Sequence, residues 1–376
     1  MKLTVFSWNI GENSNKIINM IEKKSDKLNE VLVFGFQEAS VKLINNNEYF
    51  NILNNFLEKK GYKSLDFNNK KIFSTCKTLK SRIGQFGICI LVFYKDITDI
   101  EIVDYNKKCV TGTKGYAAIC LRINDNYIDI INTHMPFTPK QQKYEDFSIN
   151  LEKWLKKERF TSENRILFGD LNSRSLLTKT CLDKDIQLCE DNNFDENYCK
   201  LSDLLENLNF TESIKPFYTI KPIKKSACSI DKKNCSITGK VKINKSNLVN
   251  ILKTNDFLGN PPNRMTSCGH LPTEYSEENI TFLPTYKRDT KKGIFSLRKG
   301  KFGRLPGYAD RIIYRTKSFL NPIEYNLIGL IGNDHLPIYK VFELNDLKER
   351  NNYTKSKKRI GYKRVNSKKL NFKSIF

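Results

Sequence analysis

The chain has 376 residues, of which 39% are apolar, and it carries 64 Lys and Arg against 41 Asp and Glu, a formal net charge of +23. This length suffices for one large domain or two medium ones, and so positive a charge is typical of proteins that meet phosphate groups. The sequence excludes membrane-spanning and collagen-like classes, since it has no apolar run of the ~18–20 residues that span a bilayer. Its ten cysteines include no C-x-x-C pair, which argues against a zinc site, and without an export signal we expect them to be reduced thiols and not a disulfide scaffold. We find no export signal at the N-terminus and therefore expect a cytoplasmic location.

The first predicted elements are two strands and a helix. Lys2–Asn9 alternates apolar and polar residues, and Val31–Phe36 is a continuous apolar run typical of a strand buried on both faces. A helix is expected over Val41–Lys60, with Ser40 as its N-cap and Gly61 as its C-terminal stop.

The middle of the chain predicts more strands and a well-marked helix. The expected strands are Gly87–Tyr94, Ala117–Ile123, Tyr127–Asn132 and Arg165–Phe168. The helix begins after Thr138 as cap and Pro139 at its first position, and its apolar residues up to Trp154 recur at spacings of three and four.

The last third predicts an insertion, three strands and a tail. Residues of about 175–279 indicate an irregular insertion, with a short amphipathic helix over Leu201–Leu208. The late strands are Ala309–Arg315, Glu324–Leu330 and Leu336–Leu344. Helices do not alternate regularly with strands, so we expect an α+β fold with two packed sheets and helices outside.

Polar residues stand at the ends of many of these strands. Burying such groups without partners would cost roughly a few kcal/mol each, so we expect them to meet at one shared rim. Each alone would be an ordinary turn residue, and their joint order carries the prediction. They are Asn9, Gln37 with Glu38, Thr133 with His134, Asp170 with Asn172, Asp310, and Asp334 with His335.

This set suits metal-assisted attack of water on a phosphate ester. Glu38, with an Asn or Asp beside it, offers the hard oxygen ligands that Mg²⁺ prefers. Asp170 can orient or deprotonate a water, and the asparagines Asn9 and Asn172 can donate to phosphate oxygens. The two histidines can donate to a developing negative charge. No P-loop is present, so ATP chemistry is not indicated.

Four longer stretches resemble known signatures. Gly169–Arg174 resembles G-D-x-N-x-R, Leu305–Ile313 resembles P-x-W-C-D-R-[IV]-L, and Gly112–Gly115 resembles G-N-K-G. Ile280–Lys287 is similar to the stretch that precedes the second of these signatures. Together they resemble the inositol polyphosphate 5-phosphatases of the endonuclease/exonuclease/phosphatase superfamily. The resemblance covers residues 1 to about 344 and implies a four-layer αββα sandwich, with two mostly antiparallel sheets flanked by helices.

The resemblance implies five catalytic residues. Asp170 would position the attacking water, and Asn172 and His134 would hold the scissile phosphate. Asp310 would orient His335, which would stabilise the transition state.

Several departures from the family lie near these residues. Tyr308-Ala309 replaces Trp-Cys before Asp310, Met135-Pro136-Phe137 follows His134 where the family usually has small residues, and Asn333 stands where the family usually has Ser before the Asp-His pair. Thr113 replaces Asn in the G-N-K-G stretch.

The resemblance also implies metal and substrate contacts. Glu38 would be the principal Mg²⁺ ligand, helped by Asn9, and Asp334 would lie close to the metal. The residues expected to contact substrate are Lys114, Tyr286, Lys287, Arg304 and Arg311.

Three functions remain open on the sequence. The first is Mg²⁺-dependent removal of the 5-phosphate from phosphoinositides or soluble inositol polyphosphates. The second is a nuclease with the same machinery, although nucleic acid is the less favoured partner because nucleases are not expected to carry the stretch Pro284–Lys287. The third is a non-catalytic phosphoinositide-binding module.

The domain prediction is a catalytic domain over residues 1–345 followed by a basic, disordered tail. Residues 346–376 carry 11 Lys and Arg against 2 Asp and Glu. Such a tail is either a solvated end or an electrostatic tether to anionic membranes, with about 1 kcal/mol per basic residue near the surface.

Overall fold

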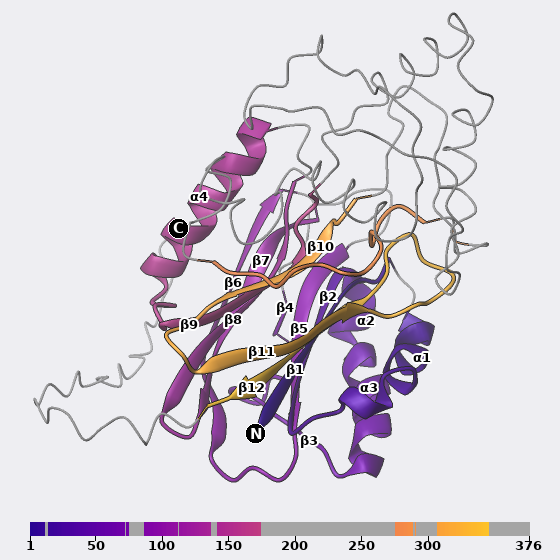
Figure 1. Cartoon of the computed structure of the whole chain (residues 1–376), viewed down its shortest axis with the longest axis vertical. Coiled ribbons are helices and arrows are strands. Elements are labelled where there is room, and N and C mark those ends of the chain that lie inside the picture. Colours follow the sequence, from indigo (N-terminus) through magenta and orange to yellow (C-terminus); the bar gives the residue numbers. More distant parts are fainter. Residues whose placement is uncertain are drawn as a thin grey trace, which may run out of the picture. The chain divides into compact units, whose positions relative to one another are not determined.

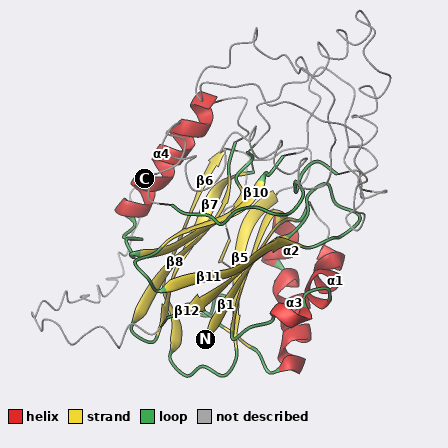
Figure 2. Ribbon diagram, viewed as in Figure 1, coloured by secondary structure: helices red, strands yellow, loops and turns green. Residues whose placement is uncertain are grey.

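A computed structural model describes residues 1–11, 14–71, 73–74, 86–111, 113–136, 141–173, 275–288, 290 and 307–345. Residues 1–345 form one compact unit, in which two sheets lie face to face between helices (Figures 1 and 2). The fold is therefore the expected α+β sandwich with four layers in the order αββα. The expected helix over Leu201–Leu208, nearly all of the expected insertion, and the tail lie outside the described residues.

The larger sheet has seven strands in the order β11-β12-β1-β2-β5-β3, with β4 also paired to β5. The central strands β1 and β2 are parallel, and the other pairs are antiparallel. Its strands are β1 (Lys2–Asn9), β2 (Val31–Ser40), β3 (Lys63–Ser64), β4 (Phe73–Ser74), β5 (Phe86–Tyr94), β11 (Leu320–Leu327) and β12 (Ile338–Leu344).

The smaller sheet has five strands in the order β10-β9-β8-β7-β6. Only β8 and β9 run parallel, joined by the crossover that contains the long helix. Its strands are β6 (Ile100–Thr111), β7 (Lys114–Ile123), β8 (Asn126–His134), β9 (Asn164–Asp170) and β10 (Asp310–Arg315).

Helices cover the outer face of each sheet (Figure 1). Helices α1 (Ile17–Glu22), α2 (Val41–Asn45) and α3 (Glu48–Leu57) pack on the larger sheet, and α4 (Gln141–Lys157) packs on the smaller one. Three short 3₁₀ turns are η1 (Ser14–Lys16), η2 (Ser25–Lys27) and η3 (Glu58–Lys60). No helix of the described ranges is long and apolar enough to cross a membrane.

The central core lies between the two sheets and is apolar apart from a few polar contacts. Val33 of β2 and Ile119 of β7 belong to it, and both are fully buried. The sheets approach closely where Gly35 faces Phe168, since a Cβ on Gly35 would lie 2.0 Å from the Phe168 ring. This contact lies just below the ends of the strands that carry the polar residues.

Several predicted boundaries were wrong. The helix expected over Val41–Lys60 is divided at Asn47, whose φ of +57° interrupts the helical backbone. Ser40 is the last residue of β2 and its side chain makes no capping hydrogen bond, whereas Gly61 does end the η3 turn with a φ of +84°. Strand β11 begins and ends earlier than the Glu324–Leu330 expected. The cap expected at Thr138 and Pro139 lies outside the described residues.

Candidate active site

Three residues of the smaller sheet meet because of their register. Asp170 is the last residue of β9, and it pairs with His134 on β8 on one side and with Asp310 on β10 on the other. All three side chains are buried. Residues more than 170 positions apart in the sequence therefore lie side by side at one end of the sheet.

The larger sheet contributes the opposite wall. Asn9 ends β1, and its neighbour in the parallel strand β2 is Gln37. His335 lies in the loop that leads into β12, which pairs with β1. The Trp8 indole donates a hydrogen bond to the His335 carbonyl oxygen at 3.2 Å, and thereby ties this loop to the end of β1.

Asp170 is the centre of the site. Its Oδ2 accepts a hydrogen bond from Asn9 Nδ2 at 3.0 Å and lies 3.1 Å from His134 Nε2 and 3.9 Å from His335 Nε2. Its Oδ1 accepts from the backbone N–H of Asn172 at 2.9 Å. Burial alone would raise the pKa of Asp170, but the positive charge of His335, the hydrogen bond with His134 and the charge of Lys114 together outweigh burial and lower it, so the carboxylate is ionised.

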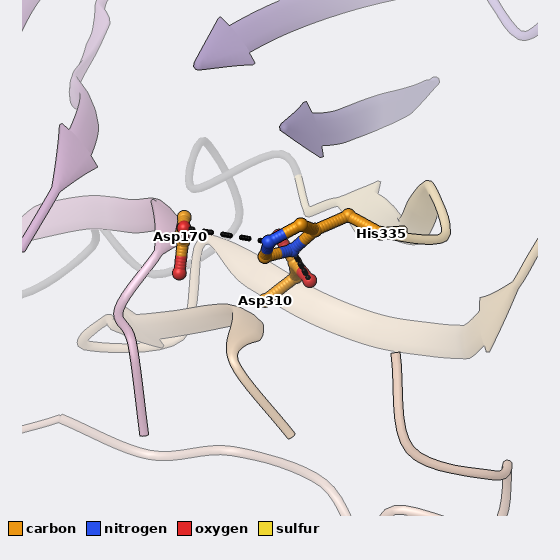
Figure 3. A group of neighbouring side chains, drawn as sticks. All are labelled: Asp170, Asp310 and His335. Atoms are coloured by element: carbon orange, nitrogen blue, oxygen red, sulfur yellow. Dashed lines mark hydrogen bonds and ion pairs between the residues drawn. The ribbon is translucent and has the colours of Figure 1, made fainter. Parts of the chain in front are cut away.

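Asp310 and His335 form a dyad beside this carboxylate (Figure 3). His335 Nδ1 lies 2.8 Å from Asp310 Oδ2, and the Asp310 backbone N–H donates to Thr285 Oγ1 at 3.2 Å. Burial would lower the pKa of His335, but the carboxylates of Asp310 and Asp170 raise it to about 10. His335 is therefore a cation at neutral pH and can donate to a developing negative charge.

The cluster of Asp170, Asp310 and His335 could in principle hold a metal ion, because one ligand atom of each lies within 4.8 Å of the others. Within the cluster, His335 Nδ1 is already paired with Asp310 Oδ2 at 2.8 Å, and all three side chains are buried. A partly exposed carboxylate lies beside the cluster and offers a second place for a cation.

Glu38 has the position and exposure that a cation requires. It lies within β2, not after it as expected, at an irregularity where its φ is +50°. Its side chain is 38% exposed, and its Oε1 lies 3.7 Å from His134 Nε2. The side-chain amide of Asn9 donates a hydrogen bond to Asp170, so its side-chain oxygen Oδ1 is the atom that could bind a cation. One carboxylate and one amide oxygen, completed by water and phosphate, fit the ligand preference of Mg²⁺.

Asn172 and Lys114 also lie at the site. Asn172 has a φ of +53°, and its Nδ2 donates to the Met135 carbonyl oxygen at 2.8 Å. The Lys114 ammonium contacts His134 Nε2. Burial and the charge of Lys114 lower the pKa of His134, so this imidazole, unlike His335, is neutral.

Two of the expected substrate residues flank the dyad. The Tyr286 ring lies 4.3 Å from the His335 ring, centroid to centroid, and is buried. Lys287 Nζ pairs with Asp334 Oδ2 at 3.0 Å, and both side chains are partly exposed. Arg304 lies outside the described residues.

Arg311, which we expected to contact substrate, is held by a buried carboxylate. Its guanidinium is fully buried and makes two hydrogen bonds to Glu277, at 2.8 and 2.6 Å. Tyr325 donates to the same carboxylate at 3.0 Å. These contacts give Arg311 a structural role, and its contact with substrate stays a prediction.

Three residues that the sequence analysis did not assign hold the site in place. Thr285 Oγ1 accepts a hydrogen bond from the Asp310 backbone N–H, as described above. The Asn132 side-chain amide donates hydrogen bonds to backbone carbonyl oxygens of the larger sheet. Asn333 Nδ2 donates to the carbonyl oxygens of Asn9 and Ile10 at 3.0 and 2.9 Å, and its Oδ1 accepts from the His335 N–H at 3.2 Å. The sequence signal for these residues was only a polar side chain within an apolar strand or next to a motif. Polar side chains next to motifs are common in ordinary loops, so this signal did not distinguish them.

The sequence profile of Endonuclease/Exonuclease/phosphatase family 2 matches residues 6–219 and 230–341. The chain belongs to this family. The two matched segments together span most of the chain and include every described residue of the site.

A relative and two solved structures extend this result. The inositol-1,4,5-trisphosphate 5-phosphatase 1 of Schizosaccharomyces pombe is 37% identical over 86 residues, which are 23% of this chain and 8% of that protein. The inositol polyphosphate 5-phosphatase domain of SPsynaptojanin, crystallised with inositol (1,4)-bisphosphate and calcium, has a TM-score of 0.58 at 22% identity and covers 91% of this chain and 84% of its own. The ferrous NO complex of a Cimex nitrophorin mutant has a TM-score of 0.52 at 16% identity and covers 91% and 97% of the two chains. These structures share the fold, and the nitrophorin shows that the fold alone does not determine function.

Proposed function

We propose that this chain is a Mg²⁺-dependent phosphatase that removes the 5-phosphate of phosphoinositides or soluble inositol polyphosphates. The observation that carries the proposal is the buried, ionised Asp170, which accepts from Asn9 and lies between a neutral His134 and a cationic His335. A carboxylate held in this way can orient a water, while the neighbouring cation can stabilise charge on phosphate. The names of the fungal relative and of the SPsynaptojanin domain favour inositol phosphates as the substrate class.

Each residue has a proposed part in the reaction. Asp170 holds the attacking water and accepts its proton. Asn172 and His134 hold the scissile phosphate, and His335, oriented by Asp310, donates to its developing charge. Mg²⁺, when bound by Glu38 and Asn9 near Asp334, would act as a Lewis acid on the phosphate oxygen.

Substrate recognition is proposed for a smaller set. Lys287 and Tyr286 would bind a phosphate next to the reacting one, because an ammonium group is a point-charge partner for phosphate. Lys114 would add a second cation, and Arg304 stays in this set as a prediction from the sequence. The location in the cytoplasm and the contact of the tail with anionic membrane are likewise proposals from the sequence.

The test is phosphate release from a panel of inositol phosphates and phosphoinositide vesicles, with nicking of plasmid DNA measured in parallel. We expect Mg²⁺-dependent release that is lost in Asp170→Ala and in His335→Ala. The nuclease is the second candidate, favoured by the net charge of +23. Nicking without phosphate release would establish it, and binding of phosphoinositides without either activity would establish a binding module.

A further inference from the structure

Glu38 reaches the site because β2 is irregular at this point. Between the pairs Phe36↔Cys89 and Ala39↔Gly87, two residues of β2 face a single residue of β5. This is a β-bulge, a feature that redirects a side chain by adding one residue to a strand. The second of the two residues that face this single residue is Glu38, with a φ of +50° that residues other than glycine adopt rarely.

The bulge is held from the opposite sheet by one buried amide. Asn132 of β8 is fully buried. Its Nδ2 donates to the carbonyl oxygens of Phe36 at 3.2 Å and of Cys89 at 2.9 Å, which are the last regular pair before the bulge. Its Oδ1 accepts a hydrogen bond at 2.7 Å from Nε2 of Gln37, the first residue of the bulge. A single side chain therefore binds both strands where their pairing becomes irregular.

The chemistry of these contacts requires an amide at position 132. Aspartate would keep the acceptor for Gln37 but lose both donors, and leucine would lose all three hydrogen bonds. The space is closed as well, because a Cβ on Gly35 would lie 3.0 Å from Asn132 Nδ2. Gln37 Nε2 also lies 3.3 Å from Ser7 Oγ, so the amides of Asn132 and Gln37 connect three strands of the larger sheet to β8. We call these two side chains the amide bridge.

We propose that the amide bridge is a positioning device for the Glu38 carboxylate, and that Asn132 and Gln37 control metal affinity without touching the metal or the substrate. Without the bridge, the bulge can move along β2, and a shift of one residue turns Glu38 to the other face of the sheet. The inference rests on the proposed function, because it takes Glu38 as the ligand of the cation.

The test measures metal binding directly on the full chain, with Mn²⁺ as the probe and the electron paramagnetic resonance signal of the free ion as readout. We expect Asn132→Asp and Gln37→Leu to weaken Mn²⁺ binding by about 10- to 100-fold, as loss of groups that orient a metal ligand usually does. Glu38→Gln gives the reference for losing the ligand itself. In the bridge variants, phosphate release should recover towards the normal kcat at saturating metal.

The matched control is Asn164→Ala. Asn164 is also a buried amide of the smaller sheet, but it lies at the other end of β9, where it donates to the Tyr127 carbonyl oxygen at 3.3 Å and accepts from Thr316 Oγ1 at 2.9 Å. Its loss should lower the melting temperature and leave Mn²⁺ affinity unchanged. If Asn132→Asp does not fold, Gln37→Leu, which is close in size to the native residue, decides alone.

Three outcomes separate the inference from the proposed function. Folded bridge variants that bind Mn²⁺ within twofold of the native chain would overturn the inference. Unchanged Mn²⁺ binding in Glu38→Gln would also overturn it, because Glu38 would then not be the ligand. A third outcome is that the native chain binds Mn²⁺, the bridge variants do not, and the native chain releases no phosphate. This outcome would support the inference and reject the phosphatase.

Discussion

His335 and His134 show how the same side chain takes two charge states within one site. His335 faces the carboxylates of Asp310 and Asp170, and its pKa rises to about 10. His134 is also buried, but it contacts the Lys114 ammonium and its pKa is lowered. The neighbouring charged groups therefore decide which histidine is a cation and which is neutral.

The charge of His335 predicts the pH dependence. Its pKa is raised from 6.5 to about 10, so its contribution to stability is complete below pH 6.5 and is lost as the pH rises through 10. Activity that needs the cation should fall over the same alkaline range. Asp310→Asn removes one carboxylate, lowers the pKa of His335 and should move this fall in kcat/KM to lower pH. Unfolding curves at each pH give the control, and an alkaline limb at the same pH in both proteins would contradict the assignment.

Lys287 predicts substrate preference. Its ammonium pairs with Asp334 at 3.0 Å and could instead bind a phosphate next to the reacting one. Lys287→Ala should raise KM about tenfold for inositol phosphates with a 4-phosphate, since a charge-assisted hydrogen bond contributes about 1.5–3 kcal/mol. Substrates that lack the 4-phosphate should lose less. Lys317→Ala, which removes a 75% exposed lysine paired with Glu163, is the control, and equal losses on both substrate classes would remove this role.

At the scale of the elements, strand ends were easier to predict than strand irregularities. The residues Asn9, His134 and Asp170 were singled out because apolar runs lead into them, and Asp310 because a strand begins there. Register then brings the strand ends together. Strand β6, from Ile100 to Thr111, was missed because the polar run Asn106–Lys108 interrupts the alternation of its apolar residues. The bulge in β2 could not be predicted from this strand alone, because its contacts include an amide of the other sheet, Asn132.

The buried ion pair of Arg311 has a measurable consequence at the scale of the elements. Arg311→Ala would remove the cationic partner of the buried Glu277 carboxylate, to which Tyr325 would still donate, and removing one member of a buried pair costs about 3–5 kcal/mol. We expect urea unfolding to show this loss. The double variant Arg311→Met with Glu277→Gln should recover part of it. An unchanged unfolding free energy with a raised KM would place Arg311 at the substrate site.

At the scale of the whole molecule, the tail remains a prediction. Deleting residues 346–376 removes 11 Lys and Arg and 2 Asp and Glu. Binding to vesicles that contain anionic lipid should weaken, because basic residues near such a surface contribute about 1 kcal/mol each. Hydrolysis of a soluble inositol phosphate should stay the same. Vesicles of neutral lipid are the control, and equal binding of the full and shortened chains to anionic vesicles would leave the tail without this role.

The site is divided between the two sheets, with Asn9, Glu38 and His335 on one and His134, Asp170 and Asp310 on the other. With the proposed roles, neither sheet alone holds the carboxylate that orients water together with the residue that binds the cation. During refolding from denaturant, recovery of hydrolysis should therefore coincide with the docking of the sheets and lag behind any signal from secondary structure. The proposed activity would then report the last step of assembly.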